Sequence, residues 1–258
     1  MVAYAGGKAV IGKRIFHDIC RIEQLWLSYH SQNELLPYFE PFIGMGGVMV
    51  HFARETKSRN LFGCDISPDI IEFWIAVTNH NWHAPPVEEC WTRENWDKLK
   101  LSNPSALRCF IGAAASYRCI FFASYRPPKV GKFDYYSQAV KKMEKFRQPM
   151  KKVNFLNSRS YEEFKDLKGR LIYADPPYLG NKLSPLFRNF DSVKFWEHMR
   201  VWSKHNLVLV SEKTAPRDFV KVGEYRSHFG EKMYTEYLFI YEDIARKLGL
   251  STDKQITA

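Results

Sequence analysis

Short apolar runs that end in a polar residue or a glycine recur along the chain, and each predicts one strand of a sheet. Residues 171–174 and 207–211 are the clearest, because consecutive aliphatic side chains are typical of strands buried on both faces. Runs of the same kind occur at 38–42, 61–65 and 153–156. Residues 225–229 and 234–241 lie on either side of Gly230 and predict an antiparallel pair.

Between these runs, apolar residues spaced three and four positions apart predict helices. Ile15, Ile19 and Ile22 indicate the first of them. Further helices are expected at 70–77, 87–101, 104–122, 136–146 and 191–204. Ser67 or Asp69 would cap the helix at 70, and Asp191 or Ser192 the helix at 191. Strands that alternate with helices indicate an α/β fold.

The net charge changes this picture because it is concentrated in one region. The chain has 258 residues and a formal charge of +10. Residues 105–152 contain eleven Lys and Arg against two acids, with Tyr and Phe between them. Basic residues interleaved with aromatic ones are typical of nucleic-acid binding. The turn-rich segment 124–133 predicts a loop that reaches DNA, and the expected contact residues are Arg118, Tyr125, Arg126, Lys129 and Lys132.

Several classes of protein fit the composition poorly. No apolar run approaches the length that spans a membrane, and residues 1–8 lack the pattern of a secretory signal. The five cysteines show no Cys-x-x-Cys spacing, so we expect reduced thiols and a cytoplasmic protein. His80 and His83 have no further ligand nearby to complete a metal site. We therefore expect no metal and no membrane partner.

The strand at 171–174 ends in Asp175, Pro176, Pro177 and Tyr178. Prolines cannot donate to a sheet ladder, so this end presents only acceptors. In an α/β sheet, ligands bind beyond the carboxyl ends of the strands. The Asp175 carboxylate and the Pro176 carbonyl suit the two hydrogens of an exocyclic amine on a nucleobase, and Tyr178 suits stacking on that base. The plain alternative is a turn after a strand.

A second candidate site follows the run at 38–42, where Phe42, Gly44 and Gly46 lead into a helical pattern from Val48. A glycine turn between a strand and a helix can hold a cofactor, but the spacing fits neither a dinucleotide fingerprint nor a P-loop. A short loop of this kind suits S-adenosylmethionine. Asp65, about twenty residues on, suits the ribose hydroxyls. The alternative places Asp65 in a turn.

The chain resembles the DNA adenine methylase family, the Dam-like N6-adenine methyltransferases. The resemblance covers most of the chain except residues 85–150, and departs from the family at Tyr4, Gly47 and Ser160. The matching pieces are Ala5-Gly-Gly-Lys8, Pro41-Phe-Ile-Gly-Met-Gly46, Cys64-Asp-Ile-Ser-Pro-Asp69, Tyr173-Ala-Asp-Pro-Pro-Tyr178, Val208-Leu-Val-Ser211 and Lys232-Met-Tyr-Thr-Glu-Tyr-Leu.

This resemblance implies a Rossmann-like methyltransferase sheet of seven strands with an antiparallel last hairpin. A catalytic domain of residues 1–84 and 151–258 would enclose a small, mostly helical target-recognition insert at 85–150. Asp175, Pro176, Pro177 and Tyr178 would be catalytic. Residues in contact with S-adenosylmethionine would be Tyr4, Gly7, Lys8, Phe42, Gly44, Gly46, Asp65, Tyr161 and Asp175.

The expected reaction is methyl transfer to adenine N6 of a base flipped out of double-stranded DNA. Lys182 and Arg188 lie in an expected loop over the site and are further DNA-contact candidates. RNA adenine and DNA cytosine N4 offer similar amines, so methyltransferases acting on them are alternatives. A DNA-binding protein on an inactive methyltransferase fold is another. The sequence leaves open a cognate restriction endonuclease and the oligomeric state.

Overall fold

A mixed sheet of seven strands organises the computed structural model, which describes residues 7–8, 10–56, 58–177, 190–229 and 232–250. The spatial order is β5-β2-β1-β6-β7-β9-β8, and β9 is antiparallel to both of its neighbours. The strands are β1 (Tyr38–Glu40), β2 (Leu61–Gly63), β5 (Val153–Phe155), β6 (Leu171–Ala174), β7 (Leu207–Glu212), β8 (Phe219–Phe229) and β9 (Lys232–Tyr241). The predicted Rossmann-like sheet with an antiparallel last hairpin is therefore confirmed.

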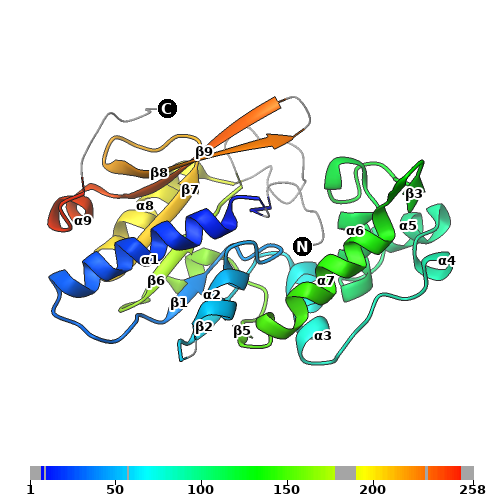
Figure 1. Cartoon of the computed structure of the whole chain (residues 1–258), viewed down its shortest axis with the longest axis horizontal. Coiled ribbons are helices and arrows are strands. Elements are labelled where there is room, and N and C mark those ends of the chain that lie inside the picture. Colours follow the sequence, from blue (N-terminus) through cyan, green and yellow to red (C-terminus); the bar gives the residue numbers. More distant parts are fainter. Residues whose placement is uncertain (1–6, 9, 57, 178–189, 230–231, 251–258) are drawn as a thin grey trace.

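Alternate residues of each strand face opposite sides of the sheet, as the pleat requires. In β6, Leu171 and Tyr173 join the core on one side, while Ile172 and Ala174 join the core on the other. The first side is covered by α1 (Gly12–Tyr29), α2 (Met49–Glu55) and α3 (Pro68–Thr78), and the second by α8 (Ser192–Ser203) and the 3₁₀ turn η2 (Tyr161–Phe164) (Figure 1). Both faces are apolar, which explains the continuous aliphatic runs.

Helix starts and stops follow local chemistry. Asp191 caps α8 by accepting from the Lys194 N–H over 3.0 Å, which confirms one of the two caps predicted there. Ser67 occupies the predicted N-cap position of α3, but its side chain makes no capping hydrogen bond there. Asp69 instead pairs with Arg108 and accepts from the backbone of Ser105. Its carboxylate ties α3 to the next helical layer.

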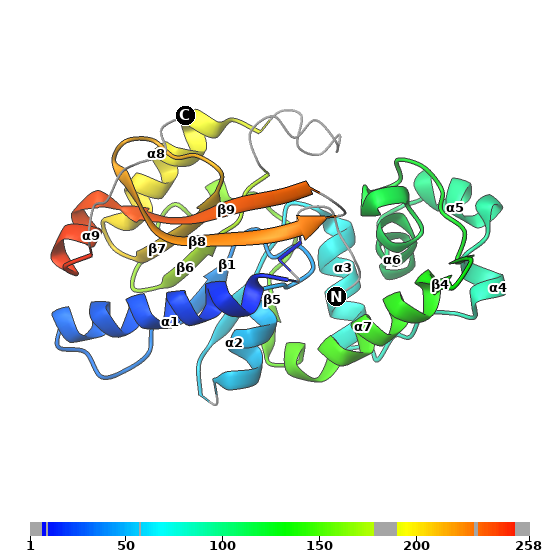
Figure 2. The same ribbon diagram turned by 45° about the horizontal axis from the view of Figure 1, so that its top comes forward.

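The region at 85–150 contains several short elements and is built on the α1–α2–α3 side of the sheet. They are α4 (Val87–Cys90), α5 (Arg93–Lys100), α6 (Ala106–Ala114), η1 (Tyr117–Cys119), β3 (Lys129–Val130), β4 (Phe133–Asp134) and α7 (Tyr135–Met150). Their buried side chains continue the core on that side. Both views place this region beside the turn end of the β8–β9 hairpin (Figures 1 and 2).

Two long helices expected in this region are broken in the structure. The one at 87–101 divides at Thr92, whose hydroxyl accepts from the Asn95 N–H and starts a new helix. The one at 104–122 ends at Ala114, because Arg118, Cys119 and Phe122 have left-handed backbones with φ of 54°, 58° and 49°. The expected loop at 124–133 contains the short antiparallel pair β3–β4.

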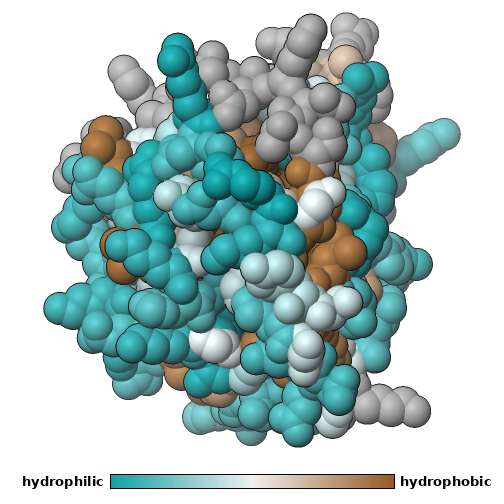
Figure 3. Space-filling model, turned by 90° about the vertical axis from the view of Figure 1, so that its left-hand side faces the viewer, coloured by the Kyte–Doolittle hydropathy of each residue, from teal (hydrophilic) through white to brown (hydrophobic). Residues whose placement is uncertain are grey.

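The remaining described segment is α9 (Glu242–Lys247), which follows β9. The face of the molecule at this end is mainly hydrophilic with small hydrophobic areas (Figure 3). None of the helices in the described part of the chain is both long and apolar enough to cross a membrane.

Candidate active site

The strand order reverses between β1 and β6, which is where a doubly wound sheet forms a crevice at its carboxyl edge. From β1 the chain proceeds outward through β2 to β5, then returns to β6 on the other side of β1. Asp175 directly follows β6, and the Phe42–Gly46 turn follows β1. The topology therefore brings the two predicted sites to one place.

Asp175 is held by a buried lysine. Lys8 Nζ lies 2.6 Å from Asp175 Oδ1 and 3.4 Å from Glu236 Oε2, and Lys8 is only 4% exposed. Burial lowers the pKa of Lys8, but attraction to Asp175 and Glu236 outweighs it and raises the pKa above its ordinary value. Lys8 is therefore charged, and this trio carries one cation against two carboxylates.

Helix α1 fixes the position of this lysine. The backbone carbonyl of Lys8 accepts from the Gly12 N–H over 2.7 Å at the start of the helix. The buried face of α1 includes Ile15, Phe16 and Ile19 and anchors the helix to the core. Packing along α1 therefore determines where the Lys8 ammonium lies relative to Asp175.

Four neighbouring strands each place one carboxylate at this edge of the sheet. Glu40 ends β1, Asp175 follows β6, Glu212 ends β7 and Glu236 lies on β9. Burial raises the pKa of Glu40 to about 8 and that of Glu212 to about 7. Burial therefore disfavours the charged forms of Glu40 and Glu212, and Lys8 pairs with the other two carboxylates, Asp175 and Glu236.

Sequence analysis did not single out Glu40, Glu212 or Glu236. The sequence signal that could have identified them is an acid that ends or interrupts an apolar strand. Burying a carboxylate there without a partner costs free energy. Glu40 has one, because the Tyr38 hydroxyl donates to its Oε1 over 2.7 Å. The next strand adds a buried hydrogen bond of 2.8 Å between the hydroxyls of Tyr173 and Ser211. These hydrogen-bonded polar groups lie on the strands next to Asp175.

The glycine turn after β1 is joined to Asp65 by direct hydrogen bonds. Asp65 Oδ2 accepts from the Gly44 N–H and Oδ1 from the Ser67 N–H, both over 2.9 Å. The Trp74 indole donates to the Gly44 carbonyl over 2.9 Å. Burial raises the pKa of Asp65 to about 6 despite these donors. Asp65 thus fixes the turn and is buried at its base.

Two glycines allow this turn to approach its neighbours closely. Gly46 has a φ of +68°, and a Cβ there would lie 2.8 Å from Met150 Cε. A Cβ at Gly12, which was not predicted as a site residue, would lie 2.1 Å from the Gly47 carbonyl oxygen. Helix α1 therefore packs against the backbone of the glycine turn itself.

We expect Gly12→Ala to separate α1 from the turn, because backbone atoms at that distance cannot give way without a shift. Overpacking of this kind costs about 1–3 kcal/mol in the free energy of unfolding. Because the displaced turn is the expected cofactor loop, cofactor affinity measured by calorimetry should fall at least about tenfold. Lys13→Ala is the control, since Lys13 is the next residue of α1 and its side chain is exposed. Equal affinities in both variants would contradict the role of this contact.

Phe42 and Tyr161 meet on the α8 side of the sheet. Their ring centroids are 5.3 Å apart, and Tyr161 also contacts the ring of Phe195. Burial raises the pKa of the Tyr161 hydroxyl. Tyr161 is mostly buried within this aromatic cluster and presents only an edge to its surroundings. Its predicted cofactor contact stays a prediction.

The predicted DNA-contact residues have different environments. Lys129 and Lys132 are exposed on the β3–β4 pair, and Arg118 is exposed with its guanidinium over the ring of Tyr117. Arg126 donates to the Ala114 carbonyl over 2.5 Å and lies over the ring of Tyr135. The Tyr125 hydroxyl donates to the Trp91 carbonyl over 3.1 Å. Tyr125 and Arg126 thus make contacts within the region, while the two lysines and Arg118 face solvent.

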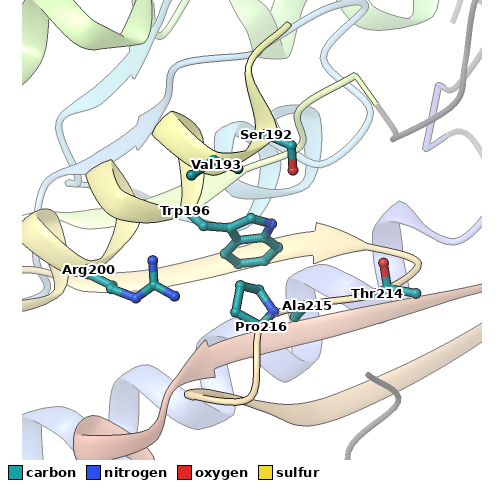
Figure 4. A pocket seen from close by; sticks show the side chains of 7 residues that line it. All are labelled: Ser192, Val193, Trp196, Arg200, Thr214, Ala215 and Pro216. Carbon is teal, nitrogen blue, oxygen red and sulfur yellow. The ribbon is translucent and has the colours of Figure 1, made fainter. Parts of the chain in front are cut away.

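Other predicted residues cannot be placed. Tyr4, Tyr178, Lys182 and Arg188 lie outside the described residues, as does the expected loop at 179–190 apart from its last residue. The described ranges contain no group of three His, Cys, Asp or Glu side chains arranged to hold a metal ion. A surface pocket between α8 and the segment after β7 includes none of the predicted site residues (Figure 4). It is lined by Ser192, Val193, Trp196, Arg200, Thr214, Ala215 and Pro216.

Comparisons with known proteins give a family and distant structural likenesses. A family model described as D12 class N6 adenine-specific DNA methyltransferase matches residues 4–242. TrmN from Thermus thermophilus is similar over 85% of this chain and 48% of its own, with a TM-score of 0.36 and 10% identity. The rRNA methyltransferase aviRa from Streptomyces viridochromogenes is similar over 88% of this chain and 85% of its own, with a TM-score of 0.39 and 10% identity. A search of curated proteins found no match.

Proposed function

Because the chain belongs to the D12 class of N6 adenine-specific DNA methyltransferases, we propose that Asp175 and the Pro176 carbonyl bind the exocyclic amine of a flipped-out adenine. The observation that carries this assignment is the position of Asp175 at the switch point of the sheet, directly beside the glycine turn. Base flipping is required because N6 of a paired adenine is out of reach of a closed pocket.

Asp175 supplies two effects in this proposal. Its carboxylate accepts a hydrogen bond from the N6 amine and orients the nitrogen toward the methyl donor. Its negative charge also stabilises the positive charge that develops on N6 during transfer. Lys8 keeps the Asp175 carboxylate in place, while Glu236 preserves a net negative charge in the trio despite the lysine. A site with this balance favours a cationic transition state.

S-adenosylmethionine is the proposed methyl donor, and the methyl group that it supplies is already activated by the sulfonium. The chain offers suitable groups for it around Phe42, Gly44, Gly46 and Asp65. Gly44 and Gly46 have left-handed backbones that shape the turn, and the main chain at Gly44 is partly exposed without a side chain over it. Each Asp65 oxygen accepts one backbone N–H and retains capacity for a ribose hydroxyl.

Residues 85–150 are the proposed target-recognition region, in contact with double-stranded DNA. The exposed cations proposed to contact DNA are Arg118, on a left-handed segment, and Lys129 and Lys132, on the hairpin of the short β3–β4 pair. Both features project from a buried aromatic core that includes Trp91, Trp96 and Phe122. A rigid scaffold whose exposed tip is positively charged suits contacts with DNA phosphates.

One assay separates this function from its alternatives. The protein and methyl-labelled S-adenosylmethionine are incubated with duplex DNA in one reaction and with RNA in another. Neither nucleic acid is methylated beforehand. Digestion to nucleosides then identifies the product. N6-methyldeoxyadenosine from duplex DNA is expected. Label in N4-methyldeoxycytidine or only in RNA would refute the proposed substrate, and absence of both transfer and cofactor binding would favour an inactive DNA-binding protein.

Cofactor affinity should fall as the pH drops through about 6. Because burial raises the pKa of the Asp65 carboxyl to about 6, Asp65 becomes protonated below that pH and loses acceptor capacity. At pH 5 roughly a tenth of the carboxylate remains, which predicts about tenfold weaker binding than at pH 7.5. Asp65→Asn should bind weakly and lack this dependence. If calorimetry finds the same cofactor affinity of the wild type at pH 5 and at pH 7.5, the role of Asp65 is contradicted.

A further inference from the structure

A second group of cations lies away from the candidate active site, on three helices that cover one side of the sheet. Helices α1, α2 and α7 lie next to one another on the near face in Figure 1. We call their outward cations the basic face, which consists of Lys13, Arg54, Lys141, Lys145 and Lys152. All five are exposed, and no ion pair with another described residue is found for any of them.

The cations of the basic face are linked by contacts across the helices. Arg54 on α2 donates to the Lys145 carbonyl over 3.2 Å and lies over the ring of Phe146 on α7. His51 on α2 has its pKa lowered by burial and by the nearby charges of Arg54 and Lys13. The neighbouring acids are Glu55, whose charge acts on His51 in the opposite direction, and Glu144 on α7, which pairs with Arg147. The positive charge is therefore continuous from α1 to α7.

The spacing along α7 produces a line of charge. Lys141 and Lys145 are one helical turn apart, and Lys152 follows two turns later, just beyond the end of the helix. At 1.5 Å per residue this line is about 16 Å long. One strand of duplex DNA has a phosphate about every 3.4 Å along the axis, so the line matches roughly five base pairs.

The chemistry of the basic face favours a phosphate backbone over a lipid surface. Membrane-binding helices combine basic residues with exposed large apolar ones. Among the exposed large hydrophobic side chains in the described ranges, α2 and α7 have none, and α1 has Tyr29 at the end of the helix far from Lys13. The first residue of α7 also directly follows the β3–β4 pair that carries Lys129 and Lys132, so the line begins beside the proposed DNA contact.

We propose that the basic face binds the sugar–phosphate backbone of duplex DNA outside the sequence that the enzyme methylates. The inference rests on the proposed function, because it assumes that DNA already lies against residues 85–150. It adds a contact surface on α1, α2 and α7 that Lys129 and Lys132 alone do not provide. Such contacts carry no sequence information and hold the enzyme on long DNA.

The test compares two triple variants with the same change in charge. Lys141→Gln, Lys145→Gln and Lys152→Gln together remove three cations of the basic face. The control replaces Lys165, Lys168 and Lys204, which are exposed around η2 and at the end of α8 on the other side of the sheet. DNA affinity is measured against salt concentration with duplexes of arbitrary sequence, about 12 and about 40 base pairs long, and a methylation assay on unmethylated genomic DNA accompanies it.

The basic-face variant should lose about two to three units of salt slope on the long duplex and less on the short one. Methylation of saturating DNA by this variant would show that it is folded and active, and the control variant should keep the wild-type slope. An unchanged slope in an active basic-face variant, or an equal loss of slope in the control variant, would overturn this inference alone. A wild-type enzyme that neither binds nor methylates DNA would overturn the proposed function as well.

Discussion

Asp175→Ala is expected to reduce methyl transfer by about a thousandfold or more, because it removes the charge that stabilises N6 in the transition state. Cofactor affinity should change little, since Gly44, Gly46 and Asp65 remain in place. The measurement is the single-turnover rate of labelled methyl transfer to duplex DNA, with cofactor affinity determined in parallel by calorimetry. Substantial methylation by this variant would remove Asp175 from the mechanism.

Two further variants show whether the effect is specific to the position of Asp175. Asp166→Ala removes an exposed carboxylate away from the site and should leave the rate unchanged. Glu236→Gln keeps Asp175 and its contact with Lys8 but removes the second carboxylate near the lysine. It should lower the rate by an intermediate factor and leave cofactor affinity unaltered. A Glu236→Gln variant with the wild-type rate would show that the charge balance of the trio is unimportant.

Sequence analysis found the site residues that end an apolar run. Asp175 ends a strand before two prolines, and Asp65 ends another before a helix, so both were visible as breaks in the pattern. Lys8 was visible beside two glycines, but its ion pair with Asp175 was not, because 167 positions separate the two residues. Contacts of that range depend on which strand lies next to which.

Glu236 and Gly12 show what the linear pattern lacks. Glu236 sits in the middle of a strand that looks like an ordinary edge hairpin, and only the reversed direction of β9 brings it to Lys8. Gly12 looks like an ordinary residue at a helix start. A side chain at position 12 is excluded because the backbone of Gly47, in the glycine turn, lies too close. Neither constraint has a periodicity that could reveal it.

The fold was easier to predict in the sheet than in the region at 85–150. Strands buried on both faces have long apolar runs, and these gave the sheet. The helices at 87–101 and 104–122 were wrong because a cap at Thr92 and left-handed residues such as Arg118 stop them. Propensity alone does not exclude a helix at either place, since non-glycine residues rarely adopt the left-handed region. Tertiary packing decides these breaks.

The largest stability effect is expected from Arg147→Met, because this buried guanidinium joins α7 to the end of α3. Arg147 donates to the carbonyls of Val77 and Trp82 over 2.6 Å each and forms two hydrogen bonds of 2.7 Å with Glu144. Methionine fills much of the same volume but leaves both carbonyls without this donor. Each buried acceptor left unpaired costs about 1–3 kcal/mol, so the free energy of unfolding should fall by about 3 kcal/mol.

Denaturant unfolding of Arg147→Met should be compared with that of Arg246→Met, which removes an arginine that is 69% exposed and pairs with Glu242. Surface pairs of this kind contribute about 0–1 kcal/mol, so the control should lose little stability. Because Arg147 ties α7 to the end of α3, its loss should also weaken DNA binding at temperatures where the fold persists. Equal stabilities of the two variants would mean that packing around Met150 and Phe146, rather than this guanidinium, holds α7 in place.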